Sequence, residues 1–271
     1  MLAGLLLVMF STMAAVVAAA EPPRRLLLIG NSITYTNNLP ALLDALLQGE
    51  GRASGSVIEM FVRPGATLED LARDPRLEGV ITGGRYDAVL LQEQGGHTLC
   101  AATEVQRRTD SCRQMIEAHL ELARRVRAVG ASVYYLGTYQ PPSASAALVA
   151  SESWLAARMG ARYIGIEPAF LALSARYPQL AWFHEGDRHP GIALSALMAE
   201  RIALSFYGAY PASAPLCTAA QLYPPGERLD GFVSFADLSA AHGPLKCVLT
   251  MAEVRSLTQP VGRLAQPATS R

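Results

Sequence analysis

The sequence predicts an α/β protein, a three-layer α/β/α sandwich built on a five-stranded parallel sheet. Short apolar and β-branched runs alternate along the chain with helix-compatible stretches, an order typical of repeated βα units. The runs are apolar on both faces, as expected for strands that helices cover on both sides. The 271 residues are 51% hydrophobic and 17% charged, a composition that suits one substantial globular core.

The elements follow one another in a regular order. The expected strands cover residues 25–29, 57–62, 86–91, 133–136 and 162–166. The expected helices cover residues 39–47, 68–73, 111–129, 148–159 and 192–207, and Gly130 ends the third of them. This order predicts a doubly wound, flavodoxin-like sheet, in which ligands bind outside the carboxyl ends of the strands.

The two ends of the chain differ in composition from the rest. Residues 1–20 form an uncharged apolar run that ends in Ala18-x-Ala20, which predicts a cleaved secretory signal peptide and export to the periplasm or the medium. An uncleaved membrane anchor is the alternative, because the run approaches the ~20 residues that span a bilayer. The main folded domain is then expected over residues 21–210. Residues 211–271 are rich in Pro, Ala and Ser and are expected to form a disulfide-clipped extension and a loose tail.

Charge and cysteine usage restrict the possible partners. Lys and Arg together number 23, as do Asp and Glu, so we expect no nucleic-acid partner and no stable membrane partner. The four cysteines predict two local disulfides, Cys100–Cys112 and Cys217–Cys247, with free thiols as the alternative. No cysteine or histidine spacing matches a metal site, so no zinc is expected.

One serine lies where a nucleophile would be exposed. The apolar strand at residues 25–29 breaks at Gly30, and Ser32 follows at its carboxyl end. A serine that merely caps the next helix is the alternative. The G-x-S-x-G turn of α/β-hydrolases is absent.

Two segments resemble one known family. The segment GNSIT at residues 30–34 resembles the first block of the SGNH (GDSL-like) hydrolases, usually written GDS, with Asn31 in place of the usual Asp. The segment LQEQ at residues 91–94 is similar to that of a bacterial subgroup that begins with GNS. The resemblance covers residues 25–207 and implies the SGNH fold, Ser32 as nucleophile and no cofactor.

The resemblance also implies an oxyanion hole. The backbone N–H groups of Ser32 and Gly65 supply two donors, and a side-chain amide supplies the third. The family uses Asn there, whereas this chain offers Gln92 and Gln94, whose carboxamides carry the same N–H₂ donor on a longer arm. We favour Gln92 because it lies nearer the end of the strand. Glutamines that only cap strand-end backbone groups are the alternative.

The base is expected at the start of the last helix. His189 followed by Pro190 resembles the family's DxxHP block and would take the proton of Ser32. Gly186 occupies the position where the family has Asp, so we favour Asp187 as the acid, with Glu185 as the alternative. His97 is a candidate substrate contact, although an ordinary hydrogen-bonded histidine would fit the sequence as well.

These residues together predict an exported serine esterase with a Ser-His-Asp triad and an acyl-enzyme intermediate. The resemblance implies acetyl or short acyl esters carried on carbohydrate or another small molecule. Two alternatives remain, an inactive binding protein that keeps the SGNH fold and an acyltransferase that uses a sugar acceptor.

Overall fold

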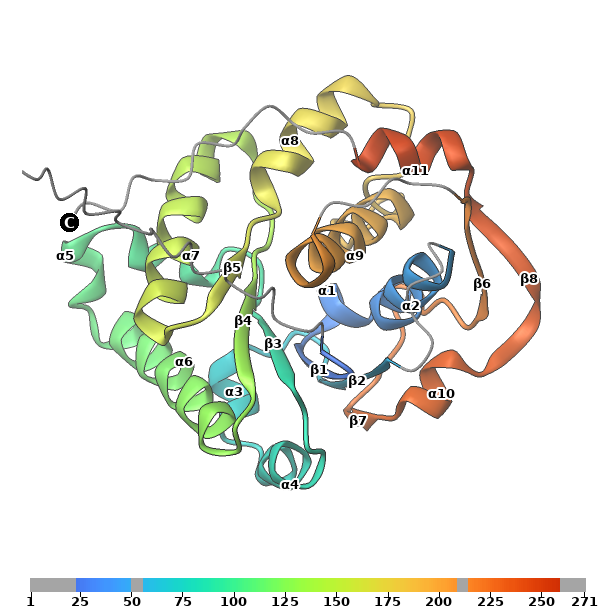
Figure 1. The fold of residues 1–271 in the computed structure, drawn as a ribbon. Coiled ribbons are helices and arrows are strands. Elements are labelled where there is room, and N and C mark those ends of the chain that lie inside the picture. The colour runs from blue at the N-terminus through green and yellow to red at the C-terminus, as the bar shows by residue number, and fades with distance from the viewer. Residues whose placement is uncertain (1–22, 50–55, 209–213, 259–271) are drawn as a thin grey trace, which may run out of the picture.

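The structure is a computed structural model that describes residues 23–49, 56–208 and 214–258. Its sheet contains five parallel strands in the order β5-β4-β3-β1-β2 (Figure 1). These strands are β1 (Arg25–Gly30), β2 (Val57–Val62), β3 (Ala88–Gln92), β4 (Ser132–Leu136) and β5 (Arg162–Ile164). The predicted α/β fold class is confirmed, and the order is that of a flavodoxin-like sheet.

Helices cover both faces of this sheet. One face packs against α2 (Leu39–Gly49), α8 (Glu167–Arg176) and α9 (Ile192–Tyr207). The other packs against α3 (Leu68–Ala72), α4 (Pro75–Gly83), α6 (Asp110–Ala128) and α7 (Ser145–Met159). Strand β1 shows why its sequence is apolar throughout, because Leu26 and Leu28 point into the first core while Leu27 and Ile29 point into the second.

A sixth strand corrects the predicted strand count. Strand β7 (Gly231–Val233) pairs antiparallel with β2, with Phe61 opposite Phe232. It comes from the region that we expected to lie outside the sheet. With only three residues, β7 is too short to show an alternating pattern in the sequence. Its pairing covers an edge of β2 that the five parallel strands would leave open.

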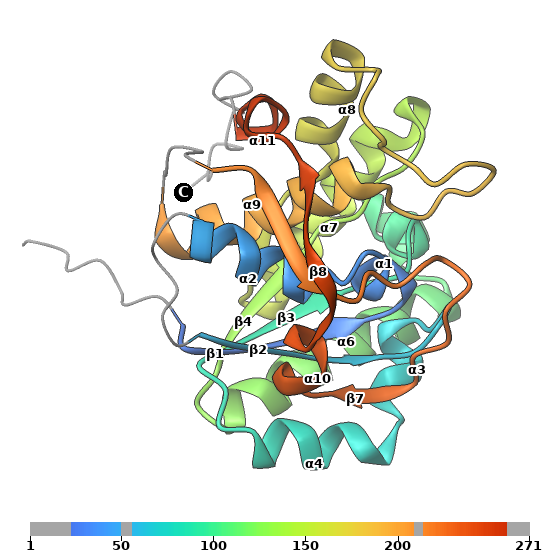
Figure 2. The same ribbon diagram turned by 90° about the vertical axis from the view of Figure 1, so that its right-hand side faces the viewer.

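The rest of the C-terminal region is also folded over residues 214–258, within the stretch where a disulfide-clipped extension was expected. Strands β6 (Leu216–Ala220) and β8 (Ala241–Leu249) form an antiparallel pair beside α2, as Figure 2 shows. Helices α10 (Phe235–Ser239) and α11 (Met251–Thr258) flank it. Residues 259–271 lie outside the described residues.

Both expected disulfides are present. Cys217–Cys247 joins β6 to β8, and Cys100–Cys112 joins the 3-10 helix η1 (His97–Ala102) to α6. The predicted signal peptide, residues 1–20, lies outside the described residues. Within the described part of the chain, no helix has the length and apolar character needed to cross a membrane.

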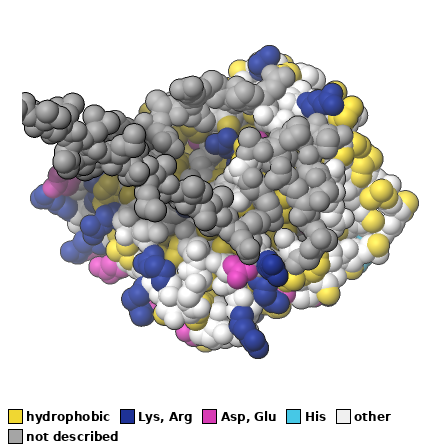
Figure 3. Space-filling model, viewed as in Figure 1, with side chains coloured by type: hydrophobic (Ala, Val, Ile, Leu, Met, Phe, Trp, Pro, Cys, Tyr) yellow, Lys and Arg dark blue, Asp and Glu magenta, His cyan; other side chains and the backbone are white. Residues whose placement is uncertain are grey.

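The surface in Figure 3 carries charges of both signs. Lys and Arg side chains alternate with acidic ones along its lower and left margins, whereas apolar side chains gather at the right, where β8 lies. Leu245 of β8 is 70% exposed. The remaining short elements are α1 (Ser32–Tyr35), α5 (Glu104–Arg107) and the 3-10 helix η2 (Pro142–Ala144).

Candidate active site

Ser32 lies at the carboxyl edge of the sheet, where β1 gives way to α1. Asn31 caps this helix, because its Oδ1 accepts the Ile33 N–H at 3.0 Å. Its Nδ2 donates to the Ala66 carbonyl at 3.0 Å, which ties the Ser32 turn to the loop after β2. A Cβ on Gly30 would approach the Thr34 hydroxyl to 2.2 Å, so the break before the serine requires glycine.

The structure brings His189 and Asp187 together with Ser32. The Nε2 atom of His189 lies 2.9 Å from the Ser32 Oγ, although the two residues are 157 positions apart. Its Nδ1 lies 2.6 Å from the Asp187 Oδ1. The carboxylate accepts a hydrogen bond from the Nδ1–H of His189. In a neutral ring, the lone pair on Nε2 therefore faces the serine hydroxyl.

Asp187 is held as a carboxylate. Its Oδ1 also accepts the backbone N–H of His189 at 2.9 Å, and this hydrogen bond, together with the one from the ring, lowers the pKa of Asp187 below its ordinary value. Glu185, the alternative acid, is exposed and does not line the cavity beside Ser32.

Buried polar side chains hold the loop that carries His189. The Nδ2 of Asn37 donates to the Pro190 carbonyl at 2.7 Å and to the Ser195 Oγ at 3.0 Å. The Tyr139 hydroxyl donates to the Arg188 carbonyl at 2.7 Å. These bonds connect the loop to the segment just after α1 and to the segment after β4. Both segments therefore help to fix the position of the His189 imidazole.

Two of the candidate oxyanion donors are the backbone N–H groups of Ser32 and Gly65. In the described part of the chain, neither the Ser32 nor the Gly65 backbone N–H donates a hydrogen bond. Gly65 lines the cavity with a positive φ of 67°, a conformation that favours glycine. Both N–H groups are therefore available to a bound anion.

Of the two candidate glutamines, only Gln94 lines the cavity. Gln92 is 1% exposed, and its carboxamide is already bonded, with Oε1 accepting from the Thr34 hydroxyl at 2.7 Å and Nε2 donating to the Glu93 carbonyl. Our preference for Gln92 is therefore wrong. As the last residue of β3, Gln92 turns toward the core, and Gln94 lies beyond the strand.

His97 does not line the cavity either, contrary to the expected substrate contact. Its Nδ1 lies 3.5 Å from the Glu93 carboxylate, which raises the pKa of His97. Glu93 is fully buried and accepts the N–H of Gln94 at 2.6 Å and of Leu68 at 3.2 Å. Glu93 thus joins the end of β3 to the start of α3, and the Nε2 of His119 lies 3.3 Å from the same carboxylate.

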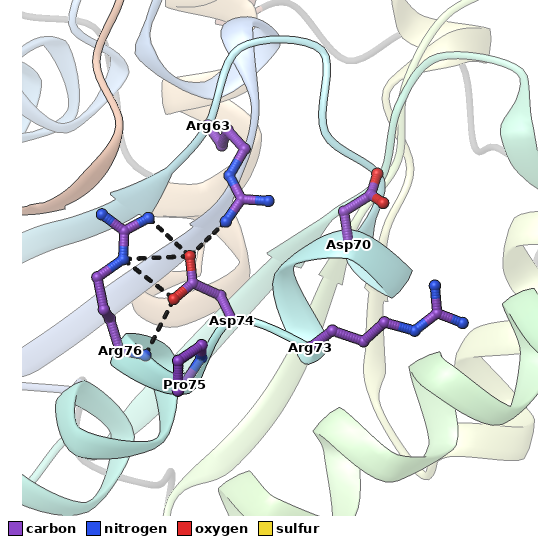
Figure 4. A pocket seen from close by; sticks show the side chains of 6 residues that line it. All are labelled: Arg63, Asp70, Arg73, Asp74, Pro75 and Arg76. Carbon is purple, nitrogen blue, oxygen red and sulfur yellow. Dashed lines mark hydrogen bonds and ion pairs between the residues drawn. The ribbon is translucent and has the colours of Figure 1, made fainter.

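The loop that carries Gly65 is anchored on its other side by ion pairs (Figure 4). Asp74 caps α4 and binds the guanidinium groups of Arg63 and Arg76. Arg76 also pairs with Asp230, 2.7 Å away in the C-terminal region. Hydrogen bonds and the two cations hold the pKa of the buried Asp74 far below its ordinary value. Since Arg63 lies two residues before Gly65, this network fixes the base of the loop.

The cavity beside Ser32 measures about 350 Å³ and is lined by both polar and apolar atoms. Its lining residues are Asn31, Ser32, Ile33, Gly65, Gln94, Gly95, Tyr139, Gln140, Asp187, Arg188 and His189. It brings a serine hydroxyl, an imidazole and backbone N–H groups together, and acyl transfer requires groups of these kinds.

Comparison with known proteins identifies the fold. No family model and no curated protein sequence matches the chain. Among solved structures, the acetyl xylan esterase AlAXEase matches with a TM-score of 0.51 at 15% identity, covering 67% of this chain and 98% of that chain. A catalytic mutant of Axe2, an acetylxylan esterase from Geobacillus stearothermophilus, matches with a TM-score of 0.50 at 16% identity, covering 71% and 97%. The chain has the SGNH hydrolase fold.

A third protein of similar fold is a DUF4886 family protein from Bacteroides uniformis ATCC 8492. It matches with a TM-score of 0.54 at 13% identity and covers 70% of this chain and 85% of that chain. The cavity beside Ser32 lies outside the carboxyl ends of β1 and β3, where a sheet of this topology binds its ligands.

Sequence reasoning missed several residues of this SGNH-fold site. Arg188 and Gln140 line the cavity, and Asn37, Tyr139 and Glu93 hold the loops around it. Arg188 could have been suspected from its position next to His189. The roles of Asn37 and Tyr139 depend on contacts between residues far apart in the sequence.

Proposed function

We propose that this chain is a serine esterase that hydrolyses acetyl or short acyl esters of sugars through an acyl-enzyme. The observation that carries the proposal is the continuous hydrogen-bonded path from Ser32 through His189 to Asp187. A serine hydroxyl becomes nucleophilic when a neutral imidazole accepts its proton, and a carboxylate stabilises the imidazolium that results.

The proposed reaction proceeds in two halves. The Ser32 Oγ attacks the ester carbonyl while His189 Nε2 takes the hydroxyl proton, and the N–H groups of Ser32 and Gly65 with the Gln94 carboxamide stabilise the oxyanion. His189 then returns the proton to the departing alcohol, which leaves the acyl group on Ser32. A water molecule, deprotonated by the same imidazole, releases the acid.

The cavity and the comparisons support a small polar ester as the substrate. Ile33 and Tyr139 are the apolar side chains that line the ~350 Å³ space, so it offers little surface to a long acyl chain. Two proteins of similar fold, AlAXEase and Axe2, are acetyl xylan esterases. We further propose that the protein is exported, since its two disulfides persist in oxidising compartments.

Fluorophosphonate labelling combined with ester turnover tests this function. The wild type is expected to label at Ser32 and to release acetate from acetylated sugars. It should also release nitrophenol from nitrophenyl acetate faster than from long-chain nitrophenyl esters. Ser32→Ala should lose both properties. Ser153→Ala, which removes a hydroxyl on α7 away from the cavity, should keep them. A folded wild type that neither labels nor turns over would instead support the inactive binding protein.

A further inference from the structure

The loop that carries His189 also brings a positive charge to the cavity. Asp187 and Arg188 are the charged residues that line it with His189. Asp187 is engaged by the ring and the backbone of His189. Among the described residues, no acidic side chain forms an ion pair with Arg188, whose side chain is exposed. By contrast, Arg63 and Arg76 are both paired with Asp74.

Two contacts position Arg188, and its charge acts on the carboxyl of Glu167 without forming an ion pair among the described residues. Its carbonyl accepts the Tyr139 hydroxyl at 2.7 Å, and its guanidinium carbon lies 5.5 Å from the centre of the Phe183 ring. Contact with a ring face leaves the N–H donors at the edge of the guanidinium plane free to bind a carboxylate in a bidentate manner. A fixed cation with unused donors is what recognition of an anionic group requires.

The mechanism indicates which part of the substrate would reach this cation. His189 must protonate the departing alcohol, so the alcohol lies on the side of the cavity formed by the His189 loop. Arg188 precedes His189 in that loop. The oxyanion donors of Gly65 and Gln94 come from other loops, so the carbonyl oxygen points away from the cation.

We propose that Arg188 selects esters whose alcohol is a sugar acid, with the sugar carboxylate bound to its guanidinium. This proposal rests on the function proposed above. Gln140 supports it, because its carboxamide lines the same cavity and forms no side-chain hydrogen bond within the described part of the chain. An amide that both donates and accepts suits sugar hydroxyl groups.

The test compares two acetylated sugars that differ in one group. Acetate release is measured from an acetylated methyl glucoside and from the matching methyl glucuronoside, which has a carboxylate at C6. The wild type is expected to show a kcat/KM about fivefold or more higher for the glucuronoside at low salt, and the preference should shrink as salt is added.

Three variants locate the preference. Arg188→Gln should bring the ratio of the two kcat/KM values close to one, and Arg188→Lys should restore part of it. Arg176→Gln removes another exposed arginine that stacks on an aromatic ring, Tyr177, away from the cavity, and should leave the ratio as in the wild type. Equal losses on both sugars in Arg188→Gln, or no preference in the wild type, would overturn the proposal.

The two proposals fail in different ways. If the esterase function is wrong, neither sugar is deacetylated in a manner that depends on Ser32. If only the role of Arg188 is wrong, both sugars are deacetylated through Ser32 at similar efficiency.

Discussion

Replacing Asp187 by Asn should slow acyl transfer without unfolding the protein. The carboxylate lies 2.6 Å from the His189 Nδ1, and its side chain is 40% exposed. Two unit charges ~4 Å apart interact by ~1 kcal/mol in water and by ~4 kcal/mol near a protein surface. Partial exposure places the interaction of the Asp187 carboxylate with the His189 imidazolium between these limits. Asp187 also holds the ring in the correct tautomer, so with both effects lost we expect kcat/KM to fall about 10²-fold.

The assay for Asp187→Asn is hydrolysis of nitrophenyl acetate from pH 5 to 9, with Glu185→Gln as the matched control. Since the pKa of Asp187 is lowered, the carboxylate is charged over this whole range and the loss should persist throughout it. Thermal unfolding should stay close to that of the wild type, because Asp187 is exposed. If Asp187→Asn and Glu185→Gln lose activity to a similar extent, the assignment of the acid is wrong.

Three further predictions follow from other residues. Asn37→Ala and Asn37→Gly should both lower kcat about tenfold, because either change releases the Pro190 carbonyl. The Ala variant should be ~1 kcal/mol less stable than the Gly variant, because the φ of residue 37 is 59°. Equal unfolding midpoints of the two variants would contradict this. Gly65→Ala should cost ~1 kcal/mol for the same reason, since a Cβ there meets nothing within 4 Å, and denaturant unfolding measures it. Burial raises the pKa of Glu200 to about 8, so its contribution to stability is present below about pH 4.5 and is lost as the pH rises toward 8. Glu200→Gln should therefore unfold at a higher urea concentration than the wild type at pH 8 and at a similar one at pH 4.5. The same difference between the two urea midpoints at both pH values would refute the reasoning.

The parallel core of the fold was predictable because each of its strands is a short apolar run. Strand β2 covers residues 57–62 and α9 covers residues 192–207, as expected from the sequence. Strand β7 was not predictable, because a three-residue strand carries no period and is stabilised by the edge of β2 that it covers. Local patterns report buried faces, whereas an edge pairing depends on the finished sheet.

The predicted site residues depended on two kinds of information. Ser32 and His189 lie in segments that could be recognised from the sequence, and the structure places their side chains 2.9 Å apart. The choice between Gln92 and Gln94 required knowing where β3 ends and what the Thr34 hydroxyl contacts. Two-residue spacing puts both on one face of an extended strand, but the strand ends at Gln92, so this rule does not extend to Gln94.

Residues that hold the site in place without lining the cavity could not be identified from the sequence. Asn37 contacts Pro190 and Ser195, more than 150 residues away. Glu93 joins two segments that are separate in sequence. A polar residue of this kind is buried because its partners satisfy it, and those partners are known only from the folded chain.

The C-terminal region holds two segments of the candidate site in place. The Tyr35 hydroxyl donates to the Glu227 carbonyl at 2.7 Å, and the Asn37 N–H donates to the Tyr223 carbonyl at 2.9 Å. These bonds hold the segment that follows Ser32, while Asp230 holds the arginines at the base of the Gly65 loop. A parallel sheet alone would leave both segments as free loops at its edge. The segment between β6 and β7 therefore braces the two loops between which the ester carbonyl is proposed to bind.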